Sequence, residues 1–150
     1  PGGLMRIGLY SQPGRRNLDQ GRRLIAEKGE ATSAEDIRRC RQDIIAMSED
    51  GNSKMAGIHN STDFFSLSEC RDMLFHVQEH RFTLPQVEDA LLDLKLKFLG
   101  FELDNQKAMR RFRKSHPSKP ALISLSLWHK FELENPSTFG AMYQFWCKKT

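Results

Sequence analysis

A chain of 150 residues is long enough to bury a core, and its 39% hydrophobic and 28% charged residues are typical of a globular protein. No apolar run approaches the roughly 20 residues of a membrane-spanning helix, so the sequence predicts no membrane association. The net charge of +4 fits an anionic partner without requiring one.

The first predicted element is a strand over residues 4–10, which follows the turn-forming Pro1-Gly2-Gly3. Its mostly apolar residues are typical of a buried parallel strand more than of an exposed edge. Two helices are predicted next, over residues 17–28 and 32–47. The second begins at a capping-box pattern, Thr32 with Glu35.

Residues 49–62 carry no hydrophobic period and are predicted to form a mobile loop. The capping-box pattern then recurs twice, at Ser66 with Glu69 and at Thr83 with Gln86. We expect one helix to run from Ser66 to about Val77 and the next to run to about residue 95.

The rest of the chain predicts a short strand over 97–103 and a basic helix capped by Asp104. A helix from Pro120 to Glu134 follows, and an aromatic-rich strand over 141–146 is predicted last. Helices therefore predominate, with strands at the beginning, middle and end. The predicted fold class is α/β.

Cysteine usage indicates the compartment. The chain has three cysteines, an odd number, with wide spacing and no C-x-x-C pair. That pattern fits neither a disulfide framework nor a zinc site, and it predicts a reducing, cytoplasmic environment. The three residues are Cys40, Cys70 and Cys147, and Cys70 shares the apolar stripe of its helix, which predicts burial.

Several stretches resemble one family. They are Pro1-Gly2-Gly3 with its strand, His80-Arg81-Phe82-Thr83-Leu84-Pro85-Gln86 continuing to Gly100-Phe101-Glu102-Leu103, and Met142-Tyr143-Gln144-Phe145-Trp146 with Lys148. They are similar to the fifth strand, the last helix with the sixth strand, and the closing seventh strand of class I, Rossmann-like S-adenosylmethionine-dependent methyltransferases of bacterial type. The region 65–100 also resembles helical extensions found in such enzymes of unassigned substrate.

The resemblance implies a topology. In that fold the seventh strand is antiparallel and lies between the fifth and sixth, so the sheet would contain three strands in the order first, last, middle. Residues 1–11 would form the first strand, 12–80 a helical insertion, 81–103 a helix plus strand, and 104–150 helices plus the closing strand of a single domain. The opening strand would then be an exposed edge, available for self-association.

The resemblance also implies that this chain is the substrate-side, C-terminal portion of the enzyme. The family binds S-adenosylmethionine on its first strands through a glycine-rich turn, and no such turn occurs in this sequence. We therefore expect the cofactor in the intact protein and no cofactor binding by this chain alone. The implied partners are a missing N-terminal methyltransferase half and a methyl acceptor that no motif identifies.

Candidate substrate-binding residues follow from position and charge. Ligands of open α/β sheets bind beyond the carboxyl ends of parallel strands, which for the opening strand are Tyr10 and Ser11. A second group is dense in titratable side chains, which favours a functional site. It contains Glu69, Arg71, His76, Glu79, His80 and Arg81. No residue is assigned a catalytic role.

Two alternatives remain. His76, Glu79 and His80 match H-x-x-E-H, which on a helix would bind zinc with Glu79 as general base. The third zinc ligand would be Glu102, Glu132 or Glu134. A simpler interpretation is that both histidines lie near a helix C-terminus, where they interact favourably with the helix dipole.

The other alternative is a non-enzymatic, basic helical interaction domain that binds RNA. Its basic residues are Arg38, Arg39, Arg41, Arg110, Arg111, Arg113, Lys114, His116 and Lys119. The aromatic residues that base stacking needs are instead predicted to pack in the core: Phe112, Trp128, Tyr143, Phe145 and Trp146.

Overall fold

The computed structural model describes residues 2–29, 31–76 and 78–150. Pro1 of the opening turn and Val77, the expected helix end, lie outside the described residues. The chain divides into two compact units. The sheet unit holds the described residues up to Arg15 together with His80–Thr150, and the helical unit holds Arg16–Glu79.

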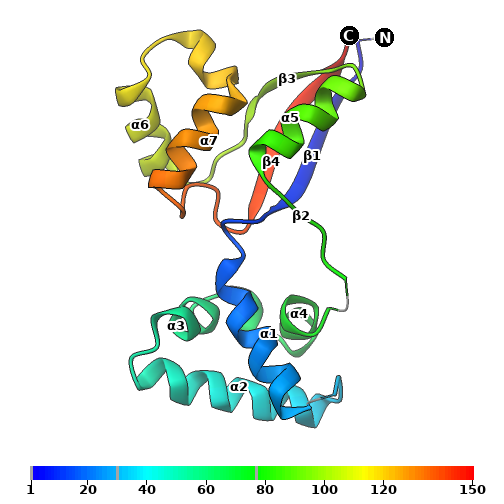
Figure 1. The fold of residues 1–150 in the computed structure, drawn as a ribbon, viewed down its shortest axis with the longest axis vertical. Helices are drawn as coiled ribbons and strands as arrows, with labels where there is room; N and C mark the ends of the chain where they lie inside the picture. Colours follow the sequence, from blue (N-terminus) through cyan, green and yellow to red (C-terminus); the bar gives the residue numbers. More distant parts are fainter. Residues whose placement is uncertain (1, 30, 77) are drawn as a thin grey trace. The chain divides into compact units, whose positions relative to one another are not determined.

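The sheet unit contains four strands, β1 (Leu4–Ser11), β2 (Arg81–Phe82), β3 (Leu96–Phe101) and β4 (Met142–Lys149), in the order β2-β1-β4-β3 (Figure 1). β4 is antiparallel to both of its neighbours, whereas β1 and β2 are parallel. The sheet is therefore mixed. An α/β, helix-rich fold is confirmed at that level.

The predicted count of three strands is wrong, because β2 is a fourth. β2 spans two residues, and in it Arg81 pairs with Tyr10 and Phe82 pairs with Ser11 of β1. One further hydrogen bond follows, from the Gln12 N–H to the Phe82 carbonyl at 2.9 Å. The opening strand is therefore not the edge at its carboxyl end. The prediction that the opening strand is buried is also wrong, because Leu4 is 63% exposed.

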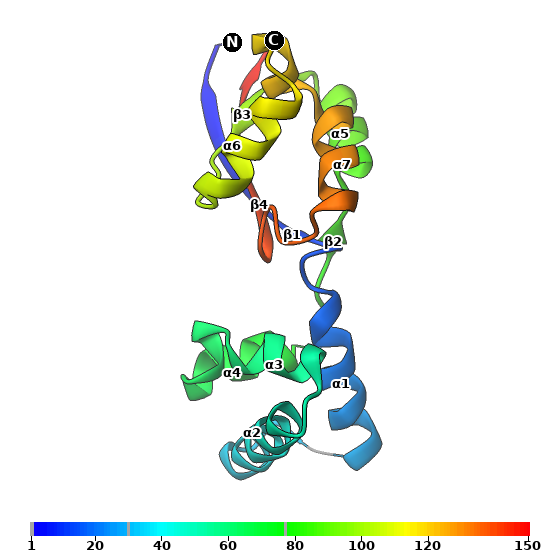
Figure 2. The same cartoon turned by 90° about the vertical axis from the view of Figure 1, so that its left-hand side faces the viewer.

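Three helical segments and one 3₁₀ segment complete the sheet unit: α5 (Leu84–Asp93), α6 (Gln106–Ser115), the 3₁₀ turn η2 (Lys119–Ile123) and α7 (Leu125–Glu134). α5 and α7 lie on the same side of the sheet (Figure 2). Phe112, Trp128, Tyr143 and Phe145 are fully buried among these elements, as predicted.

The prediction that Trp146 is buried is wrong, because the residue is 40% exposed. Side chains alternate along a strand, so Tyr143 and Phe145 face the helices and Trp146 faces the other way. Arg6, the register partner of Trp146 on β1, lies on that same outward face and pairs with Glu102 at 2.7 Å.

The helical unit consists of α1 (Arg16–Lys28), α2 (Ala34–Glu49), α3 (Ser53–His59), the 3₁₀ turn η1 (Thr62–Phe64) and α4 (Leu67–Leu74). It has its own core, in which Ile37, Ile44, Ile58, Phe64 and Cys70 are buried. Burial of Cys70 is thus confirmed. None of the described helices in either unit is long and apolar enough to cross a membrane.

Helix starts agree with the sequence only in part. The Thr83 capping box forms as predicted, and the Ser66 hydroxyl caps α4 by accepting the Glu69 N–H. However, Ser33 instead of Thr32 caps α2, and Asn105 instead of Asp104 caps α6. In each pair both residue types make good caps, so packing of the apolar face selects between neighbours.

Two further expectations are wrong. The predicted loop over 49–62 contains α3, which Asn52 caps and whose Met55 and Ile58 are buried. The helix expected from Pro120 to Glu134 is broken at Ser124, which ends η2 and caps α7.

Candidate functional site

The structure brings together four of the eight candidate residues. Tyr10 and Ser11 end β1, and Arg81 lies directly opposite Tyr10 in β2, with His80 immediately before it. Glu69, Arg71, His76 and Glu79 belong to the helical unit instead. We therefore take the carboxyl end of β1 as the candidate site.

Ser11 is fully buried and fixes the turn that follows β1. Its backbone N–H donates to the Ala141 carbonyl at 3.0 Å, and its carbonyl accepts the Arg15 N–H at 3.1 Å. Its hydroxyl accepts the Gly14 N–H at 3.0 Å and donates to Glu132 at 3.1 Å. One serine thus holds both ends of the turn over residues 12–15.

Glu132 of α7 is the buried carboxylate to which this turn is tied. It is 0% exposed and accepts hydrogen bonds from the Ser11 hydroxyl and, at 2.9 Å to each carboxylate oxygen, from the Tyr143 hydroxyl. A buried carboxylate is tolerated only when donors replace its lost hydration. Ser11, Glu132 and Tyr143 therefore form a buried cluster that joins β1, α7 and β4.

Tyr143 acts in this cluster as a neutral donor. Burial raises the pKa of its hydroxyl above the ordinary value of 10.0, and the adjacent Glu132 carboxylate raises the pKa further, although the Ser11 hydroxyl opposes the shift. A group with this pKa keeps its proton at neutral pH, so it is poorly suited to general acid–base catalysis. The cluster holds the chain in position.

The turn itself is closely packed. A Cβ added at Gly14 would lie 1.7 Å from the Gly140 carbonyl oxygen, so only glycine fits there. Arg15 is buried, and its guanidinium lies 4.2 Å from the centroid of the Tyr10 ring, which is 37% exposed. The exposed part of the candidate site is therefore an aromatic ring backed by a guanidinium and flanked by Arg81.

The candidates in the helical unit have more ordinary roles. The Glu79 side chain is 3% exposed and pairs with Arg22 at 2.9 Å, while Arg22 also donates to the Met73 carbonyl. His76 is exposed, and its Nδ1 accepts the Gln78 N–H at 3.2 Å. Glu69 and Arg71 are exposed on α4.

The alternative zinc interpretation requires His76 and His80 on one helix, and the described residues do not meet that condition. α4 ends at Leu74, and the described residues from there to His80 are not helical. Nor does the described part of the chain gather three His, Cys, Asp or Glu side chains as a metal site would need.

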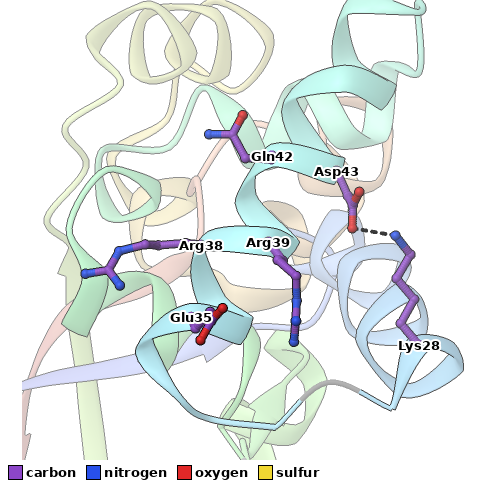
Figure 3. Close-up of a pocket in the computed structure, with 6 residues that line it drawn as sticks. All are labelled: Lys28, Glu35, Arg38, Arg39, Gln42 and Asp43. Atoms are coloured by element: carbon purple, nitrogen blue, oxygen red, sulfur yellow. Dashed lines mark hydrogen bonds and ion pairs between the residues drawn. The ribbon is translucent and has the colours of Figure 1, made fainter.

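The helical unit has an open groove of about 740 Å³ between α1 and α2 (Figure 3). Its charges are mixed: Lys28 pairs with Asp43, and Arg39 pairs with Asp36 nearby. Two of its three lining cations are thus paired, and Glu35 adds a further negative charge, so the groove has little net charge with which to attract an anion. Its other lining residues are Glu35, Arg38 and Gln42.

The residues at the strand end do not fit S-adenosylmethionine. The turn after β1 has Gly14 alone, which abuts Gly140, and its N–H is already used by Ser11. The described residues thus leave no open glycine-rich cradle at this strand end.

Sequence reasoning missed the central residue of the cluster. The sequence pattern suggests Glu132 only as a zinc ligand and Tyr143 only as a core aromatic. A signal was present: Leu125, Trp128 and Glu132 recur at helical spacing, which places Glu132 on the buried face of α7. An acid at such a position predicts nearby donors.

Comparison with protein-family models gave no match, and comparison with curated proteins also found no protein similar to this chain.

Proposed function

We propose that the chain is the C-terminal, substrate-side portion of an S-adenosylmethionine-dependent methyltransferase, and that it is not catalytically competent alone. One observation carries the proposal. β4, the last strand, is antiparallel and lies between β1 and β3. That order is the one the resemblance implies for the family's fifth, seventh and sixth strands.

The proposed contribution of this chain is to bind and orient the methyl acceptor. The carboxyl end of β1 is where ligands of open α/β sheets bind. There Tyr10 offers a partly exposed aromatic face, with the Arg15 guanidinium behind it and Arg81 beside it. Methyl transfer depends mainly on positioning, so a rigidly held strand end is useful without any catalytic side chain.

Cofactor binding provides the first test. The 150-residue chain and the complete protein that its gene encodes are titrated with S-adenosylmethionine by isothermal calorimetry. Binding by the complete protein and none by the chain alone is the expected result. A complete protein that does not bind the cofactor contradicts the proposal, as does binding by this chain alone.

The second test concerns the acceptor side, in the complete protein. Tyr10→Ala and Arg81→Ala should raise KM for the acceptor about tenfold, corresponding to about 1.4 kcal/mol, and leave the cofactor Kd unchanged. Trp146→Ala is the matched control, because it removes another exposed aromatic from the same sheet face. If Tyr10→Ala and Trp146→Ala change KM equally, the strand end does not bind the acceptor and this part of the proposal is contradicted.

A further inference from the structure

A second concave surface lies at the end of α6 in the sheet unit, far along the sequence from β1. It is a groove of about 400 Å³ between the last turn of α6 and α7. We call it the α6–α7 groove, and its principal lining residues are Arg111, Lys114, His116, Lys130, Phe131 and Glu134.

The groove lies on the most basic element of the chain. The ten residues of α6 include five lysines and arginines and no acidic residue. Arg111 and Lys114 are three positions apart, so they share one helix face, and both line the groove. Arg110 and Arg113 occupy a neighbouring face and do not line it.

These groove cations are not neutralised within the described part of the chain. Arg111, Lys114 and Lys130 form no ion pair with a described carboxylate, although Glu134 is among the lining residues. This is the reverse of the groove in Figure 3, where Lys28 and Arg39 are each paired. Three cations beside one carboxylate leave the α6–α7 groove with a net positive charge.

His116 forms a rigid part of the groove wall. Its Nδ1 is buried and has no hydrogen-bond partner among the described residues. The imidazole is stacked on Phe112 at 4.7 Å, and Phe112 is stacked in turn on the buried Trp128 at 3.5 Å, so the ring is held firmly. Because this nitrogen is itself closed to solvent, a ligand in the groove does not reach it, and the imidazole serves as a firmly packed part of the groove wall.

We infer that the α6–α7 groove binds a phosphate group, with Arg111, Lys114 and Lys130 as the cations. Arginine suits phosphate because its planar fork can donate two hydrogen bonds to one oxyanion. The only lining phenylalanine, Phe131, is 6% exposed, so the groove offers no platform for base stacking. The recognised chemistry is the phosphate itself, in a small phosphate ester or in an RNA backbone. This inference does not rest on the proposed function.

Binding is measured on the 150-residue chain with two probes. One is inorganic pyrophosphate, followed by amide chemical shifts. The other is a short fluorescein-labelled RNA, followed by anisotropy at low and moderate salt. At least one probe should bind, and a pyrophosphate titration should shift amides of residues 111–116 and 130–135. Pyrophosphate binding alone identifies a small phosphate ester, and RNA binding with a salt-dependent affinity identifies the backbone.

Two double variants locate the site. Arg111→Gln with Lys114→Gln should weaken binding by about tenfold or more, whereas Arg110→Gln with Arg113→Gln, which removes the same charge from the same helix, should weaken it less than about threefold. Circular dichroism checks that each variant is folded.

The inference is overturned if neither probe binds the parent chain, or if both double variants lose affinity equally. Equal losses would mean diffuse attraction by a basic helix.

Discussion

Replacing Tyr143 by Phe isolates one hydrogen bond of the buried cluster. The substitution removes a hydroxyl that donates at 2.9 Å to Glu132 and leaves the ring in its buried place. A hydrogen bond to a charged group contributes about 1.5–3 kcal/mol, and here the carboxylate stays buried after the donor is lost. We therefore expect the free energy of unfolding of the sheet unit to fall by about 2–3 kcal/mol near neutral pH.

The same variant makes a prediction about alkaline pH. The pKa of Tyr143 is raised above 10.0 in the folded chain, so the folded state keeps a proton that the unfolded state loses. The contribution of Tyr143 is thus fully present below pH 10.0 and declines above it, by up to about 1.4 kcal/mol per pH unit. The stability difference between the parent chain and Tyr143→Phe should shrink accordingly.

Urea unfolding followed by tryptophan fluorescence measures this difference, because Trp128 and Trp146 are the two tryptophans of the chain and both belong to the sheet unit. Titrations are run at about pH 8 and about pH 11, on either side of the ordinary tyrosine pKa. Tyr10→Phe, at an exposed ring, is the matched control. The reasoning is refuted if Tyr143→Phe is as stable as the parent at the lower pH, or if the difference is the same at both.

Three further predictions concern packing, thiols and the outward sheet face. Gly14→Ala should destabilise the sheet unit by more than about 2 kcal/mol, since its Cβ would overlap the Gly140 carbonyl, whereas Gly3→Ala, with open space around it, should change fluorescence-monitored unfolding little. The three cysteines are fully buried, so Ellman's reagent should modify none of them in the native chain and all of them in urea; rapid native reaction would contradict that burial. Arg6 holds the pKa of Glu102 below its ordinary 4.5, so Glu102→Gln should lower stability at neutral pH and have a diminishing effect as acid protonates the carboxylate; a pH-independent difference would refute this.

Local sequence signals predicted the elements whose causes are local. The Thr83 box, the Ser66 cap and the buried stripe of α4 all depend on residues within a few positions of one another. The short β2 had no such signal. It exists because Arg81 and Phe82 meet the end of β1, some seventy residues earlier in the chain, and two residues carry no readable period.

The site was predicted less well than the fold for the same reason. The position of Ser11 at a strand end was visible in the sequence, because strand ends border ligand sites. The other two residues of the cluster, Glu132 and Tyr143, lie 121 and 132 positions further along the chain. The opposite error occurred at His76 and His80, where spacing suggested a shared helix face in a segment that is not helical.

A buried carboxylate is an expensive way to stabilise a core, because well-packed apolar side chains often do as well or better. Its advantage is specificity. Ser11 and Tyr10 alternate in direction along β1, so a slip of one residue would bring the bulky Tyr10 ring to the position where the Ser11 hydroxyl meets Glu132. Glu132 therefore selects one register for β1 and one conformation for the turn at Gly14. That selection fixes Tyr10 and Arg15 at the strand end, which is the property that an acceptor-binding edge requires.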